Sequence, residues 1–459
     1  MGKDWDKLAG EKGEQVPQGR FNRLMTLGKM GAKVGLSALA NKAQSLLPED
    51  DATRDARQKQ AFEQNAERVV ETLGKLKGAS MKVGQMLSAD PELVPEGFGD
   101  MLSSLQNAAP PMTYQTISKQ IEQAFDLPME VIFSYFDPEP VGAASIGQVH
   151  RARLADGDRE VAVKIQYPGV VTSLRDDLKS LGSMMVYARA TIDKQRLDEY
   201  LNEIHEMIIQ EANYEDEARN LQRFHDLLAD RDDVDVPLPF MKWTRPSILT
   251  MEYKTGVKLD DALMALESQD EREALLLRWV ELYTWMFHEN FEMHGDPHPG
   301  NFLIQEDGTL VMLDFGSVKS FEPEFADGIL ELLDTGWQDE PERAMEIYKR
   351  MGFASKDFDF DKIDPNTLAD YHEIVFAPFM RNEPFDFTTW NPGQEGQKFM
   401  FKHPRMLKLV PPSQALPYFR MLSGIKGLLK KTGAKVNVCQ TAIDTARKRG
   451  KLTQEPIFL

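Results

Sequence analysis

The sequence predicts an α+β fold of two lobes, preceded by a helical extension. Helical spacing dominates from about residue 56 to residue 125, and short β-type runs with a turn at Ala155-Asp156-Gly157 follow it. After the strand-like "SILTMEYKTG", helical patterns return for most of the remaining chain. We therefore expect four segments: a flexible, partly basic segment (1–55), a helical extension (56–125), a small lobe (126–254) and a mostly helical large lobe (255–459).

The composition is that of an ordinary globular protein with an acidic balance. The 459 residues can bury a sizeable core, and 42% of them are hydrophobic and 28% charged. The formal charge of −19 argues against general nucleic-acid binding, which needs a basic face. A single cysteine, Cys439, excludes a disulfide framework and a cysteine-based zinc or iron–sulfur site. Since no uncharged apolar run of about 18 residues is present, we expect no transmembrane helix and a cytoplasmic protein, peripheral to a membrane if it touches one.

Residues 16–48 carry basic side chains and no acidic one, against the balance of the whole chain. One interpretation is an amphipathic segment that touches an anionic membrane surface. The other is a mobile tail, or a helix docked on its own protein. Gly28, Gly31 and Gly35 weaken any helix there, and the second interpretation is the favoured one.

The stretch "HGDPHPGNFLIQEDGTLVMLDFG" (His294–Gly316) admits two chemistries. His294 and His298 have the spacing of a helical metal-binding pair. However, His298 lies between Pro297 and Pro299, and proline lacks an N–H donor and drives the preceding residue out of the helical region. We therefore reject a metal site built on the two histidines.

The alternative is the catalytic loop of an enzyme that handles nucleotide phosphate. His294, Asp296 and Asn301 have the spacing of the kinase pattern His-Arg-Asp-x-x-x-x-Asn, with Gly295 in place of the arginine. Two strand-like runs joined by a turn then lead to Asp314-Phe315-Gly316. In such a loop Asp296 orients or deprotonates an acceptor hydroxyl, while Asn301 and Asp314 supply oxygen ligands for Mg²⁺. Two motifs that agree in order and distance predict a two-lobed protein-kinase-like fold.

Lys164, in "VAVK", matches the strand lysine that holds the α- and β-phosphates in kinases, although alone it would be interpreted as a surface lysine. Its partner should be a helix glutamate, and "QEANYEDEARN" offers Glu211, Glu215 and Glu217. On one helix Glu211 and Glu217 point about 240° apart, so they cannot both face Lys164. Each can instead be a solvated helix charge, and we expect at least one of them to be functional.

Two further stretches belong to the expected nucleotide site. "VGAASIGQV" stands one hairpin before "VAVK", where kinases have a glycine-rich loop, and Ala143, Ala144 and Ser145 are its candidate phosphate contacts. Alanine allows fewer backbone conformations than glycine, so the composition of this motif alone is weak evidence for a phosphate loop. The main support for that assignment is the position of the motif, one hairpin before "VAVK". In "MEYKTG", the backbone from Met251 to Tyr253 can bond adenine at a hinge between lobes, and a buried strand is the competing interpretation.

Together these residues resemble the UbiB/AarF family of atypical kinase-like proteins, which is associated with coenzyme Q and other isoprenoid lipids. The resemblance covers about residue 56 to the C-terminal region, and its most specific marker is "KVGQ", Lys82 to Gln85. It implies that the helical extension packs over the active site, where a protein substrate would bind. It also implies that Lys82 reaches Glu211, so that Lys82, Gln85 and Glu211 occlude or regulate the site.

The resemblance also implies roles for the other motif residues. They are a nucleotide loop of Ala143, Ala144 and Ser145, a catalytic set of Lys164, Glu217 and Asp296, and the metal ligands Asn301 and Asp314. Two positions depart from the family pattern. Gly142 stands where the family often has the first of three alanines, and Asn213 stands where it has the aspartate of Glu-x-Asp.

The resemblance implies an atypical kinase-like protein that binds ATP or ADP with Mg²⁺ and acts as an ATPase or as a phosphotransferase on a small or lipid-linked acceptor. Its metabolic context would be ubiquinone or a related isoprenoid lipid. The implied partners are the nucleotide, an isoprenoid lipid or anionic membrane surface, and quinone-biosynthesis proteins, with no nucleic acid. Two alternatives stay open: an aminoglycoside-type kinase of small molecules, and a nucleotide-binding scaffold with negligible turnover.

Overall fold

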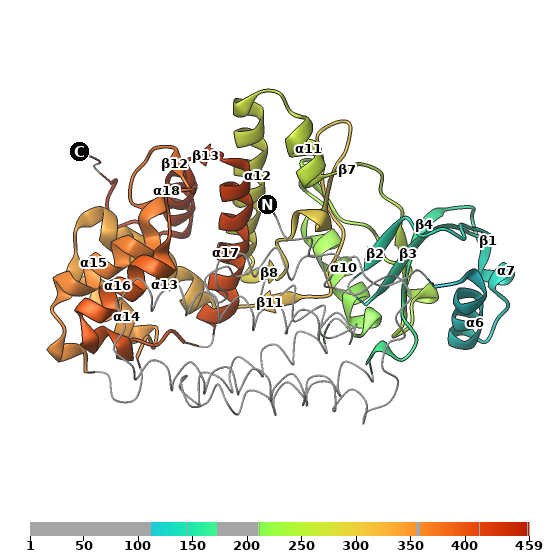
Figure 1. Cartoon of the computed structure of the whole chain (residues 1–459), viewed down its shortest axis with the longest axis horizontal. Helices are drawn as coiled ribbons and strands as arrows, with labels where there is room; N and C mark the ends of the chain where they lie inside the picture. The colour runs from blue at the N-terminus through green and yellow to red at the C-terminus, as the bar shows by residue number, and fades with distance from the viewer. Residues whose placement is uncertain are drawn as a thin grey trace, which may run out of the picture. The chain divides into compact units, whose positions relative to one another are not determined.

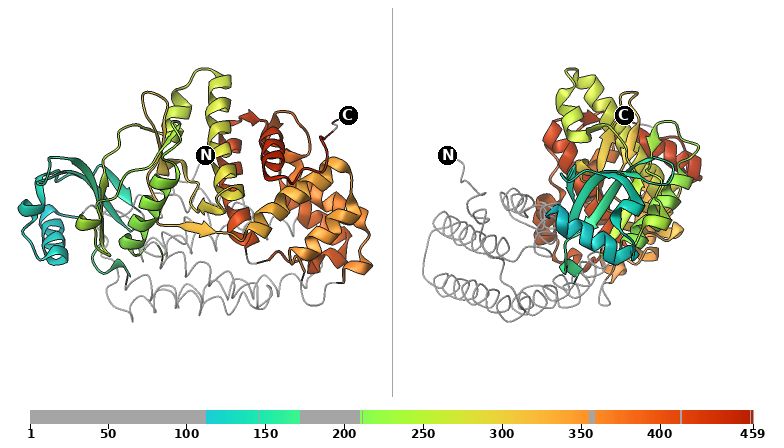
Figure 2. Two further views of the ribbon diagram at one scale, coloured as in Figure 1. Left: turned by 180° about the vertical axis from the view of Figure 1, so that it is seen from behind. Right: turned by 90° about the vertical axis from the view of Figure 1, so that its right-hand side faces the viewer.

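The computed structural model describes residues 112–144, 146–171, 210, 212–354, 359–412, 414–456 and 458. The chain divides into two compact units (Figures 1 and 2). The first runs up to Ala229 and includes Val236–Lys254, and the second comprises Asp230–Asp235 and the chain from Thr255. The four expected segments stay predictions, because residues 1–111 lie outside the described ranges.

The first unit is built on an antiparallel sheet. Its elements are α6 (Tyr114–Phe125), α7 (Met129–Ile132), β1 (Phe133–Phe136), β2 (Gly142–Ala144), β3 (Gly147–Leu154), β4 (Glu160–Gln166), α10 (Tyr214–Leu227), the 3-10 helix η3 (Met241–Trp243) and β6 (Ile248–Glu252). Strands β1, β3, β4 and β6 are hydrogen-bonded in that order, and β2 also pairs with β3. The β-type runs of the sequence are therefore strands of one sheet, as predicted.

One hydrophobic core joins this sheet to α6 and α7, which lie beside β1 in Figure 1. Helix α6 begins after Thr113, whose hydroxyl caps its first turn, and ends at Asp126 in the left-handed conformation. From α6 and β4 the core takes Ile117, Ile121, Phe125, Val161, Val163 and Ile165. Because side chains alternate along a strand, the packing of these β4 valines leaves Lys164 on the opposite face of the sheet.

The second unit is mostly helical. Its helices are α11 (Leu259–Ala265), α12 (Gln269–His288), α13 (Pro323–Gln338), α14 (Pro341–Arg350), α15 (Pro365–Phe376), α16 (Pro392–Lys402), α17 (Ala415–Thr432) and α18 (Val438–Arg449), with 3-10 helices η4 (Pro299–Asn301), η5 (Phe360–Lys362), η6 (Ala377–Phe379) and η7 (Pro404–Lys408). Its strands are β5 (Val234–Asp235), β7 (Val257–Lys258), β8 (Glu292–His294), β9 (Phe302–Ile304), β10 (Leu310–Met312), β11 (Val318–Ser320), β12 (Phe385–Asp386) and β13 (Lys435–Val436).

These short strands hold the loops of the second unit in place. A four-stranded sheet has the order β5-β10-β9-β7, and β8 pairs with β11. The hairpin between β9 and β10 turns at Gly308, whose φ of +88° favours glycine. Arg278 of α12 donates to the Gly308 carbonyl at 2.7 Å and fixes the turn. The predicted pair of strands before Asp314 is therefore present.

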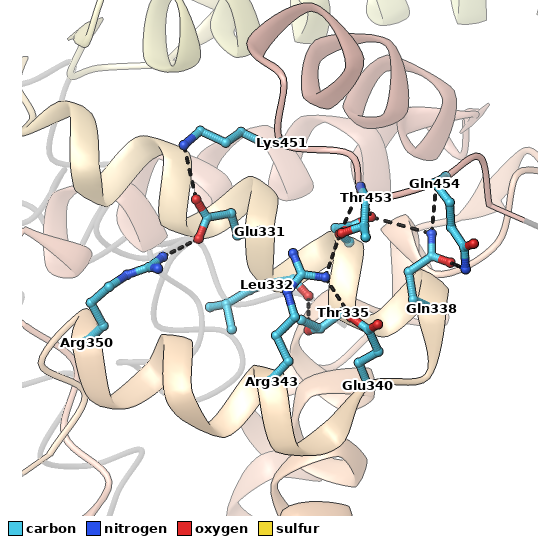
Figure 3. Close-up of polar contacts among 11 residues, drawn as sticks. Glu331, Leu332, Thr335, Gln338, Glu340, Arg343, Arg350, Lys451, Thr453 and Gln454 are labelled. Carbon is cyan, nitrogen blue, oxygen red and sulfur yellow. Dashed lines mark hydrogen bonds and ion pairs between the residues drawn. The ribbon is translucent and has the colours of Figure 1, made fainter.

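The segment that follows α18 is held to α13 by polar contacts (Figure 3). Glu331 of α13 contacts both Arg350 of α14 and Lys451. Gln338 Nε2 donates to the Gln454 carbonyl at 2.9 Å, and Gln454 Nε2 donates back to Gln338 Oε1 at 2.6 Å. Single surface contacts of this kind add little stability, but a network of them can hold a segment in one position.

Among the helices in the described ranges, none combines the length and the apolar composition needed to cross a bilayer.

Candidate active site

In the first unit, Lys164 and Glu217 form a buried ion pair. Lys164 Nζ lies 2.8 Å and 3.0 Å from the two carboxylate oxygens of Glu217. The side chains are 7% and 1% exposed. The ammonium also lies 5.0 Å from the centre of the Tyr214 ring, a cation–π distance. The structure thus brings together two residues that the sequence predicts as one catalytic pair.

The start of α10 explains why Glu217 reaches the lysine. Asn213 is the N-cap, and its side chain accepts a hydrogen bond from the Glu215 N–H at 3.2 Å. The buried Gln166, at the end of β4, donates from its side-chain amide to the Ala212 carbonyl at 2.8 Å. The helix is therefore capped and tied to the strand that carries Lys164. Since asparagine caps a helix as well as aspartate does, this departure from the family motif keeps the cap.

The hairpin of β2 and β3 contains part of the alanine-rich loop. Ala144 pairs with Gly147 across the hairpin. A Cβ at Gly147 would collide with the Ile165 carbonyl of β4, so this glycine is required by close strand packing. Gly142 has nothing within 4 Å of its Cβ position, so alanine would fit there. Ala143 is placed by its backbone in β2, whereas Ser145 lies outside the described residues.

The expected hinge continues strand β6. Met251 is 5% exposed and pairs with Ala162 of β4. The Tyr253 N–H donates to the Glu160 carbonyl at 3.3 Å, so this donor is used within the sheet. Met251 therefore lies in a buried strand, as the competing interpretation expects. An adenine contact from the backbone of this stretch stays a prediction.

In the second unit, the catalytic-loop motif begins at the end of β8. His294 is 1% exposed, and its Nε2 contacts the Asp314 carbonyl, so Nε2 carries the proton. Its Nδ1 then accepts from the Tyr283 hydroxyl at 3.3 Å and from the Asp296 N–H at 3.4 Å. Burial lowers the pKa of His294, although the charges of Asp296 and Asp314 oppose this shift. A neutral imidazole therefore links the two aspartates of the motif.

The backbone at His298 is extended, with φ −66° and ψ 128°, as the flanking prolines predict. Its Nδ1 accepts from the Gly300 N–H at 3.1 Å, so it caps a short 3-10 turn. In the described part of the chain, no three His, Cys, Asp or Glu side chains gather closely enough to hold a metal ion.

The glycine that replaces the kinase arginine is closely packed. The Gly295 N–H donates to the Ser317 carbonyl at 2.7 Å. A Cβ on Gly295 would lie 2.6 Å from Ser317 Oγ and 3.1 Å from its carbonyl oxygen. Since Ser317 is buried, a long side chain at position 295 would require the chain after Asp314 to move.

Asn301 and Asp314 lie at adjoining ends of paired strands. The Leu313 N–H donates to the Asn301 carbonyl at 2.9 Å, which places Asp314 next to the start of β9, the strand that follows Asn301. Asn301 Nδ2 donates to the Asp296 carbonyl at 3.2 Å, so the side-chain oxygen is oriented as the acceptor. The Gly316 N–H donates to Asp314 Oδ1 at 3.0 Å. Both residues therefore present hard oxygen atoms, the ligands that Mg²⁺ prefers.

Four of the predicted site residues, Lys82, Gln85, Ser145 and Glu211, lie outside the described residues, as do residues 16–48. Other residues that position the site were not predicted from the sequence. Asn213 before an acidic first turn is a usable N-cap signal. No local signal identifies Gln166, Tyr283 or Ser317, because their partners are distant in the sequence.

Comparison with known proteins supports the kinase-like fold and identifies the family. The model of the ABC1 atypical kinase-like domain matches residues 104–348, just over half of the chain. The chain is 29% identical over 446 residues to the atypical kinase coq-8, mitochondrial, of Caenorhabditis elegans, covering 92% of this chain and 56% of that protein. It is 33% identical over 279 residues to the chloroplastic protein ACTIVITY OF BC1 COMPLEX KINASE 8 of Arabidopsis thaliana, covering 59% of this chain and 36% of that protein.

A solved structure shares the fold. The complex of Rv3197 with erythromycin from Mycobacterium tuberculosis has a TM-score of 0.59 and 25% sequence identity, and the match covers 85% of this chain and 98% of that one. The chain spans 56% and 36% of the two curated relatives, so their lengths exceed the compared region. The motif geometry, the family match and the shared fold agree, and the chain belongs to the ABC1 atypical kinase-like family, which includes the proteins named COQ8.

Proposed function

We propose that the protein binds ATP with Mg²⁺ and cleaves its terminal phosphoryl group, transferring it to water or to a small or lipid-linked acceptor. The observation that carries this proposal is the buried ion pair of Lys164 and Glu217. Holding two charges out of water costs free energy, and a purely structural sheet would be as stable with apolar residues in their place. A phosphate-binding lysine needs such a partner to fix its position.

The motif residues divide the chemistry among them. Lys164 would bind the α- and β-phosphates while Glu217 keeps its ammonium in position. Asp296 would orient the attacking hydroxyl or water and accept its proton. Asn301 and Asp314 would hold Mg²⁺, which when bound neutralises phosphate charge. His294 keeps the backbone of Asp314 fixed through its Nε2 contact.

The metabolic context that we propose is ubiquinone or a related isoprenoid lipid, since relatives carry COQ8 names. The proposed partners are the nucleotide, an isoprenoid lipid or anionic membrane surface, and quinone-biosynthesis proteins. The proposed location is cytoplasmic and peripheral at a membrane. The occlusion of the site by Lys82, Gln85 and Glu211 remains part of the proposal and favours a small acceptor over a protein.

The test is phosphate release from Mg·ATP by the full chain, with and without anionic liposomes or a ubiquinone-precursor mimic. We expect release that a lipid stimulates and that is lost in Asp314→Asn and in Asp296→Asn. Nucleotide binding without release under every condition would instead support the scaffold, or transfer to an acceptor other than those supplied. Release that requires an added aminoglycoside-like acceptor would support the small-molecule kinase.

A further inference from the structure

A small apolar cavity lies within the second unit, among α12, α13, α17, α18 and the segment from η6 to Trp390. Its volume is about 60 Å³. Its walls are mostly aromatic and aliphatic, and they include Phe287, Trp390, Met421, Leu429 and Ala442. A cavity of about 150 Å³ with such walls stays dry and binds benzene or xenon, so this smaller one suits an atom or group of xenon size.

Three polar side chains in the wall donate their hydrogen bonds to backbone carbonyls of the protein. Thr284 Oγ1 donates to the Val280 carbonyl at 2.9 Å, and Trp390 Nε1 donates to the Ile374 carbonyl at 3.0 Å. His288 Nδ1 donates to the Ala326 carbonyl at 3.0 Å. Burial lowers the pKa of His288 to about 3, so this ring is neutral at neutral pH. Lys426 and Tyr418 also line the cavity, and the Lys426 ammonium lies 5.1 Å from the centre of the Trp390 ring. The donors of Thr284, Trp390 and His288 are already used, and the aliphatic and aromatic majority of the wall favours an uncharged, apolar ligand.

Two walls of the cavity also contact the catalytic loop. On α12, Tyr283 lines the cavity, and its hydroxyl donates to His294 Nδ1 at 3.3 Å. On α17, Met421 and Ile425 line the cavity, while Gly424 between them packs so closely on Pro297 that a Cβ would collide with it. The cavity wall and the catalytic loop therefore share two direct contacts, one at the histidine and one at the proline of the motif.

We propose that this cavity is a binding site for a small uncharged apolar ligand, of the size of the branched end of an alkyl chain. Its occupancy is coupled to the catalytic loop through the Tyr283 hydroxyl. Binding and the response of His294 do not depend on ATP chemistry, whereas any effect on turnover rests on the proposed function. By thermodynamic linkage, a ligand that favours one position of the loop is itself bound more tightly when the loop holds that position.

The experiment uses xenon as the probe on the full chain, with occupancy located in crystals under xenon pressure and the ring nitrogens of His294 followed by NMR. We expect xenon in the cavity and a change of the His294 resonances that saturates with occupancy. An empty cavity under saturating pressure would overturn the site. Occupancy without any change at His294 would overturn the coupling.

Three variants separate binding from coupling. Tyr283→Phe keeps the ring in the wall but removes the hydroxyl, so xenon should still bind while the His294 response is lost. Ala442→Val should weaken xenon binding by about tenfold or more, because its added methyl groups take up the cavity. The control is Ala446→Val on the same helix, at a buried alanine outside the cavity wall, which should retain xenon binding.

These readouts distinguish the two proposals. A chain that never cleaves ATP, with or without an acceptor, can still bind xenon and shift the His294 resonances, and this result would reject the proposed function alone. An equal loss of xenon in both alanine variants, with both still folded by their thermal transitions, would show that the cavity wall does not determine binding and would reject the site.

Discussion

At the residue scale, the ion pair of Lys164 and Glu217 depends on contacts that the local sequence does not contain. The sequence identified the lysine and restricted the glutamate to three candidates. The local pattern alone does not choose among them, because the choice depends on where α10 begins and how it is tied to β4; the family resemblance is what selects Glu217. The cap at Asn213 and the amide of Gln166 supply that information. The structure places Glu217 on the lysine, while the catalytic role of the pair stays a prediction.

The first prediction concerns the charge that is left when one partner is removed. Lys164→Met removes the Lys164 ammonium from the buried Glu217 carboxylate, which should lower the free energy of unfolding by about 3–5 kcal/mol. The double variant Lys164→Met/Glu217→Leu should recover most of that loss, because the carboxylate is removed together with the lysine that neutralises it. Urea unfolding of the full chain measures both, and both variants should lose Mg·ATP binding.

The control for that cycle is Glu215→Gln, on the same turn of α10, which should change stability by about 0.5 kcal/mol or less. A double variant as unstable as Lys164→Met would show that the Glu217 carboxylate does not cause the loss of stability.

The second prediction concerns Gly142, where the family often has alanine. A Cβ meets nothing within 4 Å there, so Gly142→Ala should leave the fold intact. Alanine lowers the conformational-entropy cost of ordering the loop by about 0.4–1 kcal/mol. When the nucleotide binds the same backbone conformation, the affinity of the protein for the nucleotide should rise about two- to fivefold. Titration with a fluorescent nucleotide tests this, with Gly147→Ala as the contrasting variant that should disrupt the hairpin. Weaker binding by Gly142→Ala would mean that the bound loop needs the freedom of glycine.

At the element scale, the strands and helices around the motifs follow from local patterns, but their packing does not. The prolines beside His298, the turn before Gly308 and the alternation in "VAVKIQ" each specify a local conformation, and the structure has it. The sequence pattern of α17 also predicts a helix. Its close approach to Pro297, however, depends on Gly424, and nothing in the sequence of that helix says which of its glycines faces the loop.

The third prediction tests that approach with two glycines of α17. Gly424→Ala places a methyl group against Pro297 and should displace the catalytic loop, lowering turnover more than stability. Gly427→Ala has open space at its Cβ position and should stabilise the helix by about 0.5–1 kcal/mol with turnover unchanged. Phosphate release and thermal unfolding of the two variants provide the comparison. Equal turnover in both would contradict a role for the α17 contact.

The fourth prediction concerns the contact between α14 and α15. The Tyr348 hydroxyl lies 3.2 Å from His372 Nδ1, and burial lowers the pKa of His372 to about 3. Above pH 6.5 the histidine is neutral in both the folded and the unfolded chain. As the pH falls from about 6.5 to about 3, only the unfolded chain binds the proton, so stability falls by about 4–5 kcal/mol through this residue.

His372→Gln, which cannot take up that proton, should flatten the decline of unfolding free energy over this pH range. Denaturant unfolding at several pH values measures the slope. Parallel curves for the variant and the wild type would show that other groups cause the acid sensitivity.

At the scale of the whole molecule, the order of motifs along the chain was sufficient to predict a two-lobed kinase-like fold. Each motif is short and specifies its own conformation, and their order is that of the fold. Contacts between distant segments were not predictable in this way. Asp334 of α13 accepts from the Thr453 N–H at 3.2 Å and from Arg343 at 2.8 Å, and it is fully buried. Neither this anchor nor the apolar cavity leaves a periodic signal in the sequence.

The fifth prediction asks whether the motifs of both units act on one nucleotide. At a free Mg·ADP concentration of about 100 times its dissociation constant, a folded chain that binds it should gain about 2.7 kcal/mol of stability. Asp314→Asn should lose only the part of this gain that requires Mg²⁺, and EDTA should remove that same part in the wild type. Lys164→Met, compared with its own ligand-free state, should lose the gain entirely. Thermal unfolding with ADP, with and without Mg²⁺, measures all of these. If the Asp314→Asn variant kept a gain in stability that EDTA still removes, Mg²⁺ would be held by other residues. If Lys164→Met kept the full gain, the nucleotide would not be held by the strand lysine. The kinase-like interpretation of the buried pair would then be wrong.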